Sequence, residues 1–178
     1  MKAFKILLVL FFLNGLGLKM YSQFNWVEIG VDGLTCSACS RSVEMSIRKL
    51  SFVDSVSMNL ENTRGKISFK KGEKVEIEKI AKAVTDAGFS LRSLYAGINI
   101  TELNVSNDYC WTFENSAYHF IKISESKQFK GFITIKFIGE KYMPHKEYKD
   151  WKSYCTNSCV LPSNSVRPTS RSYHVSLL

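Results

Sequence analysis

Apolar and polar residues follow two different periods along residues 25–94. Three stretches alternate apolar and polar positions, which predicts strands with one buried face: residues 27–31, 56–60 and 67–69. Two stretches repeat apolar residues at intervals of three and four, which predicts amphipathic helices: residues 43–50 and 77–84. With a last short strand at residues 91–94, the order is βαββαβ. This order predicts an α+β, ferredoxin-like fold in which two helices cover one face of a four-stranded sheet.

The pattern changes after Tyr95, Ala96 and Gly97, where we place a domain boundary. Further strands are predicted at residues 98–105, 110–113, 118–123 and 132–138, and a short helix at residues 145–154. This order predicts a small β-rich domain over residues 96–160, OB-like by its fold-level pattern alone. Residues 161–178 are Ser-, Pro- and Arg-rich with little apolar pattern, and they predict a flexible tail.

Residues 1–22 have the organisation of a secretory signal peptide. Lys2 and Lys5 precede an apolar run at residues 6–13, and Asn14 ends that run. A membrane-spanning helix needs about 20 apolar residues, so the run predicts a signal cleaved between Ser22 and Gln23. The alternative is a short uncleaved helix. We therefore expect an exported protein, periplasmic or extracellular, that does not span a membrane after cleavage.

Composition and charge limit the classes of partner that the protein can be expected to bind. The 178 residues are 45% hydrophobic and 22% charged, which is ordinary for a globular protein. Removing residues 1–22 lowers the formal net charge from +8 to +5, because three lysines and no acidic residue lie there. The remaining charges are spread along the chain without a block of one sign. We therefore expect no nucleic-acid partner.

The candidate chemistry lies in a C-x-x-C pair, Cys36 and Cys39, between the first predicted strand and the first predicted helix. Backbone N–H groups at a helix start carry partial positive charge, which favours a thiolate over a thiol and lowers a cysteine pKa. Thiolates are the ligands that soft metals select. The pair therefore predicts an accessible soft-metal site.

Other kinds of site share this spacing. A zinc site needs four ligands, and residues 23–109 contain no histidine and no further cysteine. A thioredoxin-like redox pair suits an exported protein, but such enzymes place a proline against the dithiol, and all three prolines lie far downstream. A structural disulfide closing so short a loop removes little chain entropy. Two thiolates alone suit a metal with linear or trigonal sulfur coordination, such as Cu(I) or Hg(II).

The segment Gly33-Leu34-Thr35-Cys36-Ser37-Ala38-Cys39 is similar to the G-M-T-C-x-x-C signature of heavy-metal-associated domains. The resemblance covers residues 23–94 and includes Asp86-Ala87-Gly88-Phe89. These domains occur in copper chaperones, copper-transporting P-type ATPases and periplasmic mercury-scavenging proteins. The resemblance implies a protein without catalytic activity. It also implies that Leu34, in place of the usual Met, packs under the loop, and that Phe89 lies near the metal-binding loop.

We therefore expect an exported protein that sequesters or transfers Cu(I) through Cys36 and Cys39, with Gly33, Leu34, Thr35 and Phe89 supporting the loop. Hg(II) and Zn(II) are the alternative metals. The expected partner is a metal-donor or metal-acceptor protein such as a metal-transporting ATPase. A secreted thiol–disulfide oxidoreductase with Cys36 as nucleophile is the alternative of another class.

A second set of soft ligands lies in the β-rich part of the chain. Cys155 and Cys159 form C-x-x-x-C, with Met143 and His145 upstream and His174 downstream. This set predicts either a second metal site or a disulfide, and the oxidising compartment favours the disulfide. Two pairs would leave Cys110 as a single buried thiol, and His119 is expected to be an ordinary histidine of a strand.

Overall fold

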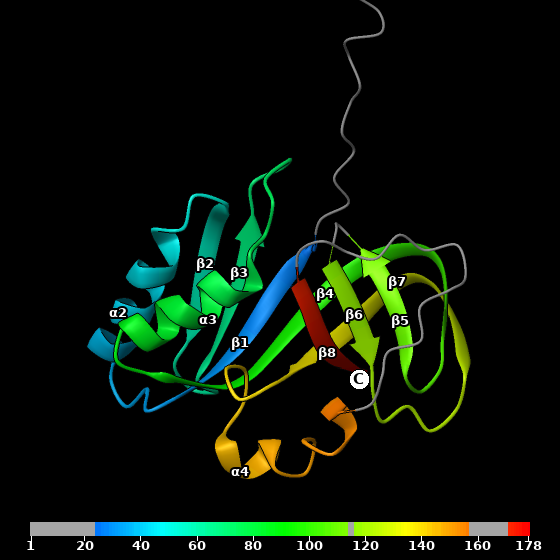
Figure 1. Ribbon diagram of the computed structural model, residues 1–178. Helices are drawn as coiled ribbons and strands as arrows, with labels where there is room; N and C mark the ends of the chain where they lie inside the picture. The colour runs from blue at the N-terminus through cyan, green and yellow to red at the C-terminus, as the bar shows by residue number, and fades with distance from the viewer. Residues whose placement is uncertain (1–23, 114–115, 157–170) are drawn as a thin grey trace, which may run out of the picture.

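The computed structural model describes residues 24–113, 116–156 and 171–178 (Figure 1). In chain order, its helices and strands are β1 (Trp26–Asp32), α2 (Ser37–Arg48), β2 (Val53–Asn59), β3 (Arg64–Phe69), α3 (Ile77–Asp86), β4 (Ser90–Val105), β5 (Tyr109–Phe113), β6 (Ser116–Phe120), β7 (Lys127–Ile138), α4 (His145–Tyr148), the 3-10 helix η1 (Tyr154–Thr156) and β8 (Arg171–Leu177). The strands form one eight-stranded sheet in the order β2-β3-β1-β4-β7-β8-β6-β5.

The N-terminal half has the predicted ferredoxin-like βαββαβ order, with α2 and α3 on the same face of β2, β3 and β1 (Figure 1). The helices turn their predicted apolar positions to the sheet. Val43 and Ile47 of α2, and Ile80 and Val84 of α3, have no exposed surface. Burial of side chains at helical spacing is what makes such a helix stable in a protein. This part of the predicted fold is confirmed.

Tyr95, Ala96 and Gly97 lie inside a strand, where the sequence predicts a boundary between domains. β4 is 16 residues long. Its first part pairs with β1 from Asp32↔Ser90 to Trp26↔Gly97, and its second part pairs with β7 from Tyr95↔Lys136 to Val105↔Lys127. The strand therefore changes its main partner at the predicted boundary, and the two halves of the chain share it.

The C-terminal half is an open part of the same sheet. Among the described strands, β5 and β2 are the two edges, and no pairing closes the sheet into a barrel. The OB-like architecture is therefore not confirmed. The predicted helix over residues 145–154 is shorter, because α4 covers His145–Tyr148 and turns lead from it to η1.

The prediction of a flexible tail over residues 161–178 is wrong for its last part. Residues 171–177 form β8, which runs antiparallel to β7 and parallel to β6. Tyr173, Val175 and Leu177 alternate toward the core, but the sequence pattern assigns this short run, which follows a segment rich in Ser, Pro and Arg, to the tail. Residues 161–170 lie outside the described residues.

Side-chain contacts also join the two halves beyond the shared strand. Phe24 precedes β1 and lies in an aromatic cluster with Phe113, Tyr118 and Phe137, at centroid distances of 6.0–6.2 Å. Arg171 at the start of β8 forms ion pairs with Glu76 and Glu78 at the start of α3, at 3.3 and 3.1 Å. The N-terminal half is therefore packed and ion-paired against strands that follow it by up to 95 residues.

The predicted signal peptide over residues 1–22 lies outside the described residues. Within the described part of the chain, no helix is long and apolar enough to cross a membrane.

Candidate metal centre

The C-x-x-C pair lies at the turn that leads from β1 into α2. Gly33 follows β1 with a φ of +87°, a left-handed conformation that glycine adopts without steric cost. The Thr35 N–H then donates to the Gly33 carbonyl at 3.0 Å, which closes a tight turn. Cys36 is extended and forms the N-cap of the 12-residue helix α2. The glycine turn thus delivers the chain to the helix start with Cys36 outside the helix and Cys39 in its first turn.

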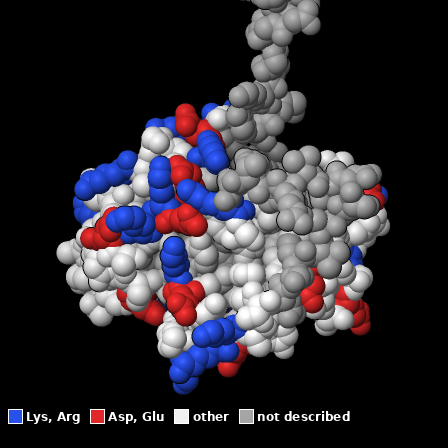
Figure 2. Space-filling model, viewed as in Figure 1, with Lys and Arg blue, Asp and Glu red and all other residues white. Residues whose placement is uncertain are grey.

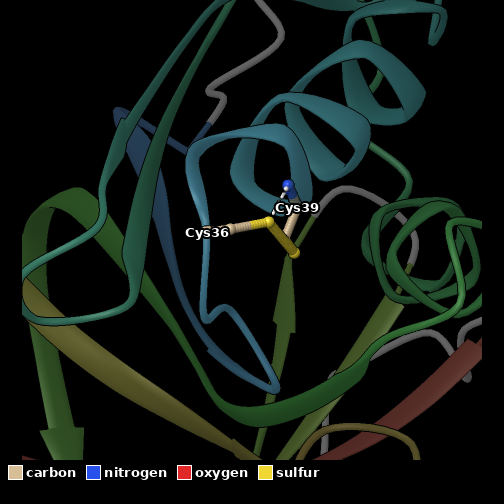
Figure 3. Close-up of a disulfide and its surroundings, with 2 residues drawn as sticks. All are labelled: Cys36 and Cys39. Carbon is tan, nitrogen blue, oxygen red and sulfur yellow. Dashed lines mark hydrogen bonds between the residues drawn. A yellow bond between two sulfur atoms is a disulfide. The ribbon is translucent and has the colours of Figure 1, made fainter.

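The two sulfurs meet in front of the first turn of α2 (Figure 3). Cys36 and Cys39 form a disulfide with a Cα–Cα distance of 5.2 Å. The Cys39 backbone N–H also donates to Cys36 Sγ at 3.2 Å. Cys36 is exposed, whereas Cys39 is half-buried and packs against the core. One sulfur is therefore open to solvent and the other is anchored.

The helix start favours negative charge on these sulfurs once the disulfide is reduced. The unpaired N–H groups at the N-terminus of α2 carry partial positive charge, and the first turn of α2 contains no acidic residue. Cys36 Sγ already takes the position of a capping acceptor. A thiolate at that position is stabilised by the helix, as soft-metal ligation requires.

Neighbouring side chains hold the loop from below and from one side. Leu34 is 5% exposed and belongs to the main hydrophobic core. Phe89, just before β4, covers the turn, since a Cβ atom added to Gly33 would lie 3.6 Å from Phe89 Cδ1. Thr35 is exposed and contributes its backbone to the turn. Leu34 thus ties the loop to the core while Cys36 stays exposed.

Ser40, directly after Cys39, was not singled out from the sequence. Its backbone N–H donates to the Cys36 carbonyl at 3.2 Å. Its hydroxyl is buried and has no hydrogen-bond partner in the described part of the protein. A serine among surface-favouring residues gives no sequence signal of burial, so this position could not have been found from the pattern.

The described residues bring no third ligand to the pair. No group of three or more His, Cys, Asp or Glu side chains able to hold a metal ion occurs within residues 24–113, 116–156 and 171–178. The described residues therefore offer the two sulfurs of Cys36 and Cys39 as the soft ligands of this loop. Soft metals accept coordination by two sulfurs, whereas a structural zinc site needs four ligands.

The predicted disulfide between Cys155 and Cys159 is not formed, because Cys155 is a free thiol. Cys159 lies outside the described residues. The Cys155 thiol packs beside Tyr148 and Trp151, and burial raises its pKa. Cys155 lies in the 3-10 helix η1, which covers Tyr154–Thr156.

The other predicted ligands lie apart from one another. Met143 is buried against Ile121 and Ile138. His145 is exposed at the start of α4, and His174 lies in β8. Cys110 is disulfide-bonded rather than a free thiol, which corrects the expectation from cysteine counting.

Residues 28–90 match the family model of the heavy-metal-associated domain. The copper chaperone CopZ of Bacillus subtilis is 36% identical over 61 residues, which are 34% of this chain and 87% of CopZ. The chain belongs to the heavy-metal-associated domain family. The predicted resemblance is therefore confirmed.

Further relatives of this heavy-metal-associated protein carry different functions. The periplasmic component of the mercuric transport protein of Serratia marcescens is 35% identical over 63 residues, 35% of this chain and 68% of that protein. Copper-transporting ATPase 1 of Rhizobium meliloti is 36% identical over 69 residues, 39% of this chain and 8% of the ATPase. The chain thus spans less than a tenth of the length of that ATPase, and the similarity lies in the domain that carries Cys36 and Cys39.

Proposed function

We propose that this protein binds Cu(I) through the thiolates of Cys36 and Cys39 and passes it to a partner protein. The observation that carries the proposal is the paired sulfur site at the start of α2. Its two cysteines have Cα atoms 5.2 Å apart, and no third ligand is brought to them by the described residues. Membership of a family with copper and mercury relatives supports a soft metal as the cargo.

Transfer follows from the low coordination number. A thiolate or thioether of the partner adds to the metal and gives a three-coordinate intermediate, and then one of the two cysteine thiolates leaves. Cys36 is the exposed sulfur and Cys39 the half-buried one, so the partner sulfur approaches from the side of Cys36. Metal binding and exchange need no catalytic residue, in keeping with a binding protein.

Metal loading requires the disulfide to be opened. Two electrons cleave the Cys36–Cys39 bond and give two thiols, which lose their protons as the metal binds. A dithiol reductant supplies these electrons and is itself oxidised to a disulfide. The exposed position of Cys36 makes attack by a reducing thiolate sterically accessible.

The charges on the face that carries α2 and α3 are intermixed (Figure 2). On α3, Lys79 pairs with Glu76 at 2.5 Å and Lys82 with Asp86 at 2.6 Å. No large area of one sign covers this face in the view. We therefore propose that a partner, such as a copper-transporting ATPase, is selected by its metal-binding sulfurs and by shape rather than by a strong electrostatic field.

We also propose that the protein is exported and acts in the periplasm or outside the cell, on the basis of residues 1–22. Mass spectrometry of the exported chain checks this. A mature N-terminus near Gln23 supports export with cleavage, and an intact Met1 in the mature species contradicts cleavage.

The function is tested by anaerobic Cu(I) titration of the reduced protein against a competing chromophoric chelator. The expected result is one tightly bound Cu(I), which Cys36→Ser and Cys39→Ser each abolish. Cys155→Ser is the matched control, because it removes a thiol outside the loop and should leave this site unchanged. A second bound Cu(I) that disappears in Cys155→Ser would instead support a second site built with Cys159.

Two further assays separate the alternatives. Titration with Hg(II) and competition between the two metals show which metal the site prefers, and preferential retention of Hg(II) in the presence of Cu(I) would support mercury scavenging. Insulin reduction measures thiol–disulfide exchange. Turnover in that assay without stoichiometric Cu(I) binding would overturn the proposal in favour of an oxidoreductase.

A further inference from the structure

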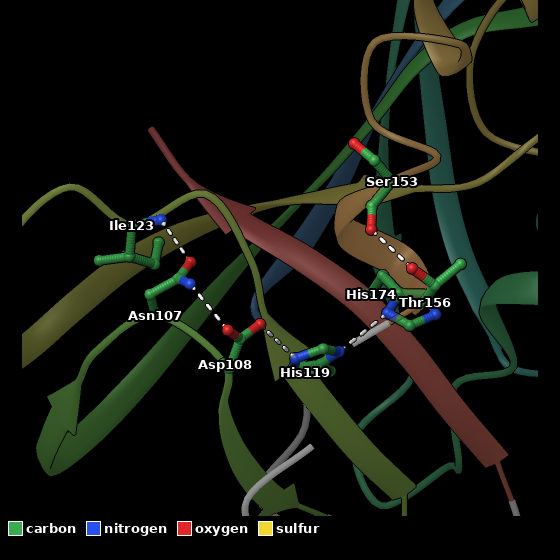
Figure 4. A network of polar contacts seen from close by, with 7 residues as sticks. All are labelled: Asn107, Asp108, His119, Ile123, Ser153, Thr156 and His174. Carbon is green, nitrogen blue, oxygen red and sulfur yellow. Dashed lines mark hydrogen bonds and ion pairs between the residues drawn. The ribbon is translucent and has the colours of Figure 1, made fainter. Parts of the chain in front are cut away.

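Two histidines far apart in sequence face each other inside the C-terminal half (Figure 4). β6 and β8 pair in parallel, and their register places His119 opposite His174. The two Nδ1 atoms are 3.1 Å apart, at hydrogen-bond distance. His119 is 1% exposed and His174 is half-buried. This contact joins the only parallel neighbours in the described sheet.

The far side of His119 faces a carboxylate. His119 Nε2 lies 3.2 Å from Asp108 Oδ1. Asp108 is fixed in turn, because its own N–H donates to the Phe120 carbonyl at 2.8 Å and Asn107 Nδ2 donates to Asp108 Oδ2 at 2.8 Å. The Asn107 side-chain oxygen accepts from the Ile123 N–H at 3.2 Å. The chain of contacts is therefore anchored in the backbone at its outer end.

This arrangement assigns the protons. An ionised carboxylate can only accept, so His119 donates Nε2–H to Asp108. A neutral His119 then has a lone pair on Nδ1, and His174 donates its Nδ1–H to that lone pair. The pair can take up one proton and still keep a single hydrogen between the two Nδ1 atoms. A second added proton would have to sit on His119 Nδ1, where it would oppose the N–H of His174 across 3.1 Å.

No described group near the two histidines compensates for an N–H on both Nδ1 atoms. Opposite His119 on β5 is Cys110, which is disulfide-bonded and does not titrate. Opposite His174 on β7 is Ile138, and the next residue of β7 on that face, Lys136, is ion-paired with Glu147 at 2.5 Å. In the cluster that packs on Ile138, burial raises the pKa of both Tyr148 and Cys155. These two groups are therefore neutral in mildly acidic solution, and Asp108 is the charged group that contacts the pair.

We propose that the His119–His174 pair is an acid-sensitive latch on β8. In neutral solution the shared proton holds β8 against β6, in the middle of the C-terminal part of the sheet. In acid, protonation of both imidazoles places an N–H on each of the two facing Nδ1 atoms. The two N–H groups repel each other, and the contact between β8 and β6 opens. Because Arg171 at the start of β8 forms ion pairs with Glu76 and Glu78, release of β8 also removes these contacts from α3 of the heavy-metal-associated domain.

The direction of the pH effect follows from proton counting. Burial, and then the nearby His119, lower the pKa of His174 below its ordinary value. The stabilising contribution is therefore present above the unfolded histidine pKa of about 6.5 and is lost as the pH falls below it. At pH 5, the unfolded chain binds a proton that the folded pair does not bind. Each such proton shifts the folding equilibrium toward unfolding by about 30-fold.

The test compares urea unfolding of the full oxidised chain at pH 7.5 and pH 5.0. His174→Asn is the informative variant, because a side-chain amide can present either N–H or C=O to His119 and so removes the conflict. His145→Asn is the matched control, since His145 is exposed on α4. Between the two pH values the wild type and the control should lose about 30-fold more in folding equilibrium constant than His174→Asn.

Nitrogen-15 imidazole spectra of the wild type provide a second measurement that needs no variant. They should show His119 protonated on Nε2 and the pair taking up one proton, not two, down to pH 5. Hydrogen exchange of the β8 amides, corrected for the intrinsic rate, should accelerate at pH 5. Two independent titrations near pH 6.5, or equal pH dependence in wild type and His174→Asn, would overturn the proposal.

Discussion

Phe24 lies edge-on against Phe137 of β7, with ring centroids 6.2 Å apart and ring planes at 67°. The residue precedes β1 of the heavy-metal-associated domain, and its partner belongs to the part of the sheet that follows that domain. The sheet of this domain continues from β4 into β7, and the segment before β1 packs in the core of the C-terminal half. The loop that carries Cys36 and Cys39 is at the opposite end of β1 from Phe24, so these aromatic contacts support the domain without touching the cysteine pair.

Replacing Phe24 with Ala should therefore weaken the whole chain without weakening metal binding. Phe24 is 3% exposed, and truncation of a buried Phe costs about 3–5 kcal/mol. Urea unfolding should show this loss, while the Cu(I) affinity of the reduced protein stays unchanged. Phe132→Ala is the matched control, because Phe132 is 52% exposed and should cost much less. Equal losses in the two variants would show that Phe24 is not part of a shared core.

A chain of residues 23–95 should fold by itself, but with lower stability than the full chain. It keeps β1, α2, β2, β3 and α3, and the register of β1 with β4 up to Glu28↔Tyr95. It loses the pairs Val27↔Ala96 and Trp26↔Gly97 and exposes Phe24. Circular dichroism should show helix and a cooperative thermal transition below that of the full chain. An unfolded spectrum would show that the ferredoxin-like half depends on β7.

The periodic half of the chain could be predicted, and the connection between the halves could not. Val43, Ile47, Ile80 and Val84 repeat at helical spacing and are buried as expected, because in a small two-layer fold the period reports directly which face meets the sheet. At Tyr95–Gly97 the sequence pattern suggests an end of the strand, but β4 continues through these residues. Gly97 is needed there because an added Cβ would lie 2.5 Å from atoms of both Trp26 and Phe132. A glycine that makes room for aromatic side chains from two other strands cannot be told from a linker glycine without knowing those strands.

The same limit applies to the sites. Cys36 and Cys39 are close in sequence, and their position between a strand and a helix determines that they lie at a helix start. His119 and His174 are separated by 55 residues, and their contact depends on β8, whose short pattern did not reveal a strand. The protonation partners of a buried histidine are set by such long-range pairing, and local sequence carries no trace of it.

Replacing Leu34 with Met should change Cu(I) affinity little. Leu34 is buried in the core below the loop, and an exchange between Leu and Met keeps volume and polarity, at a cost below about 1.5 kcal/mol. Competition titration of reduced protein should therefore give affinities within a few-fold of each other. Leu34→Ala is the contrasting variant, since a cavity there would lower the stability and loosen the loop. A large affinity change in Leu34→Met would mean that this side chain contacts the metal.

Gly33→Ala should lower stability while the two cysteines remain able to bind metal. The backbone φ of +87° is unfavourable for a residue with a Cβ, at a cost of about 1–2 kcal/mol. The new methyl group would meet Phe89 at 3.6 Å, an ordinary contact distance, so steric overlap adds little. Thermal unfolding should show the loss. Gly72→Ala is a matched control, because Gly72 has a φ of +86° with nothing within 4 Å of an added Cβ. A much larger loss in Gly33→Ala than in Gly72→Ala would show that packing against Phe89, and not backbone strain, restricts this position.

The described cysteines should differ in reactivity in a fixed order. Cys155 is the free thiol, and burial raises its pKa. Its alkylation without reductant should therefore be slow at pH 7 and accelerate as the pH rises toward that pKa, because the thiolate is the reactive form. A mild dithiol reductant should next release Cys36 and Cys39, since their bridge lies in an exposed loop.

Cys110 is disulfide-bonded with no exposed surface, so its labelling should require unfolding. Alkylation followed by peptide mapping measures this order, with Cys155→Ser as the control for the first step. Labelling of Cys36 and Cys39 before any reductant is added would mean that the pair is reduced in the native protein and ready to take up metal directly.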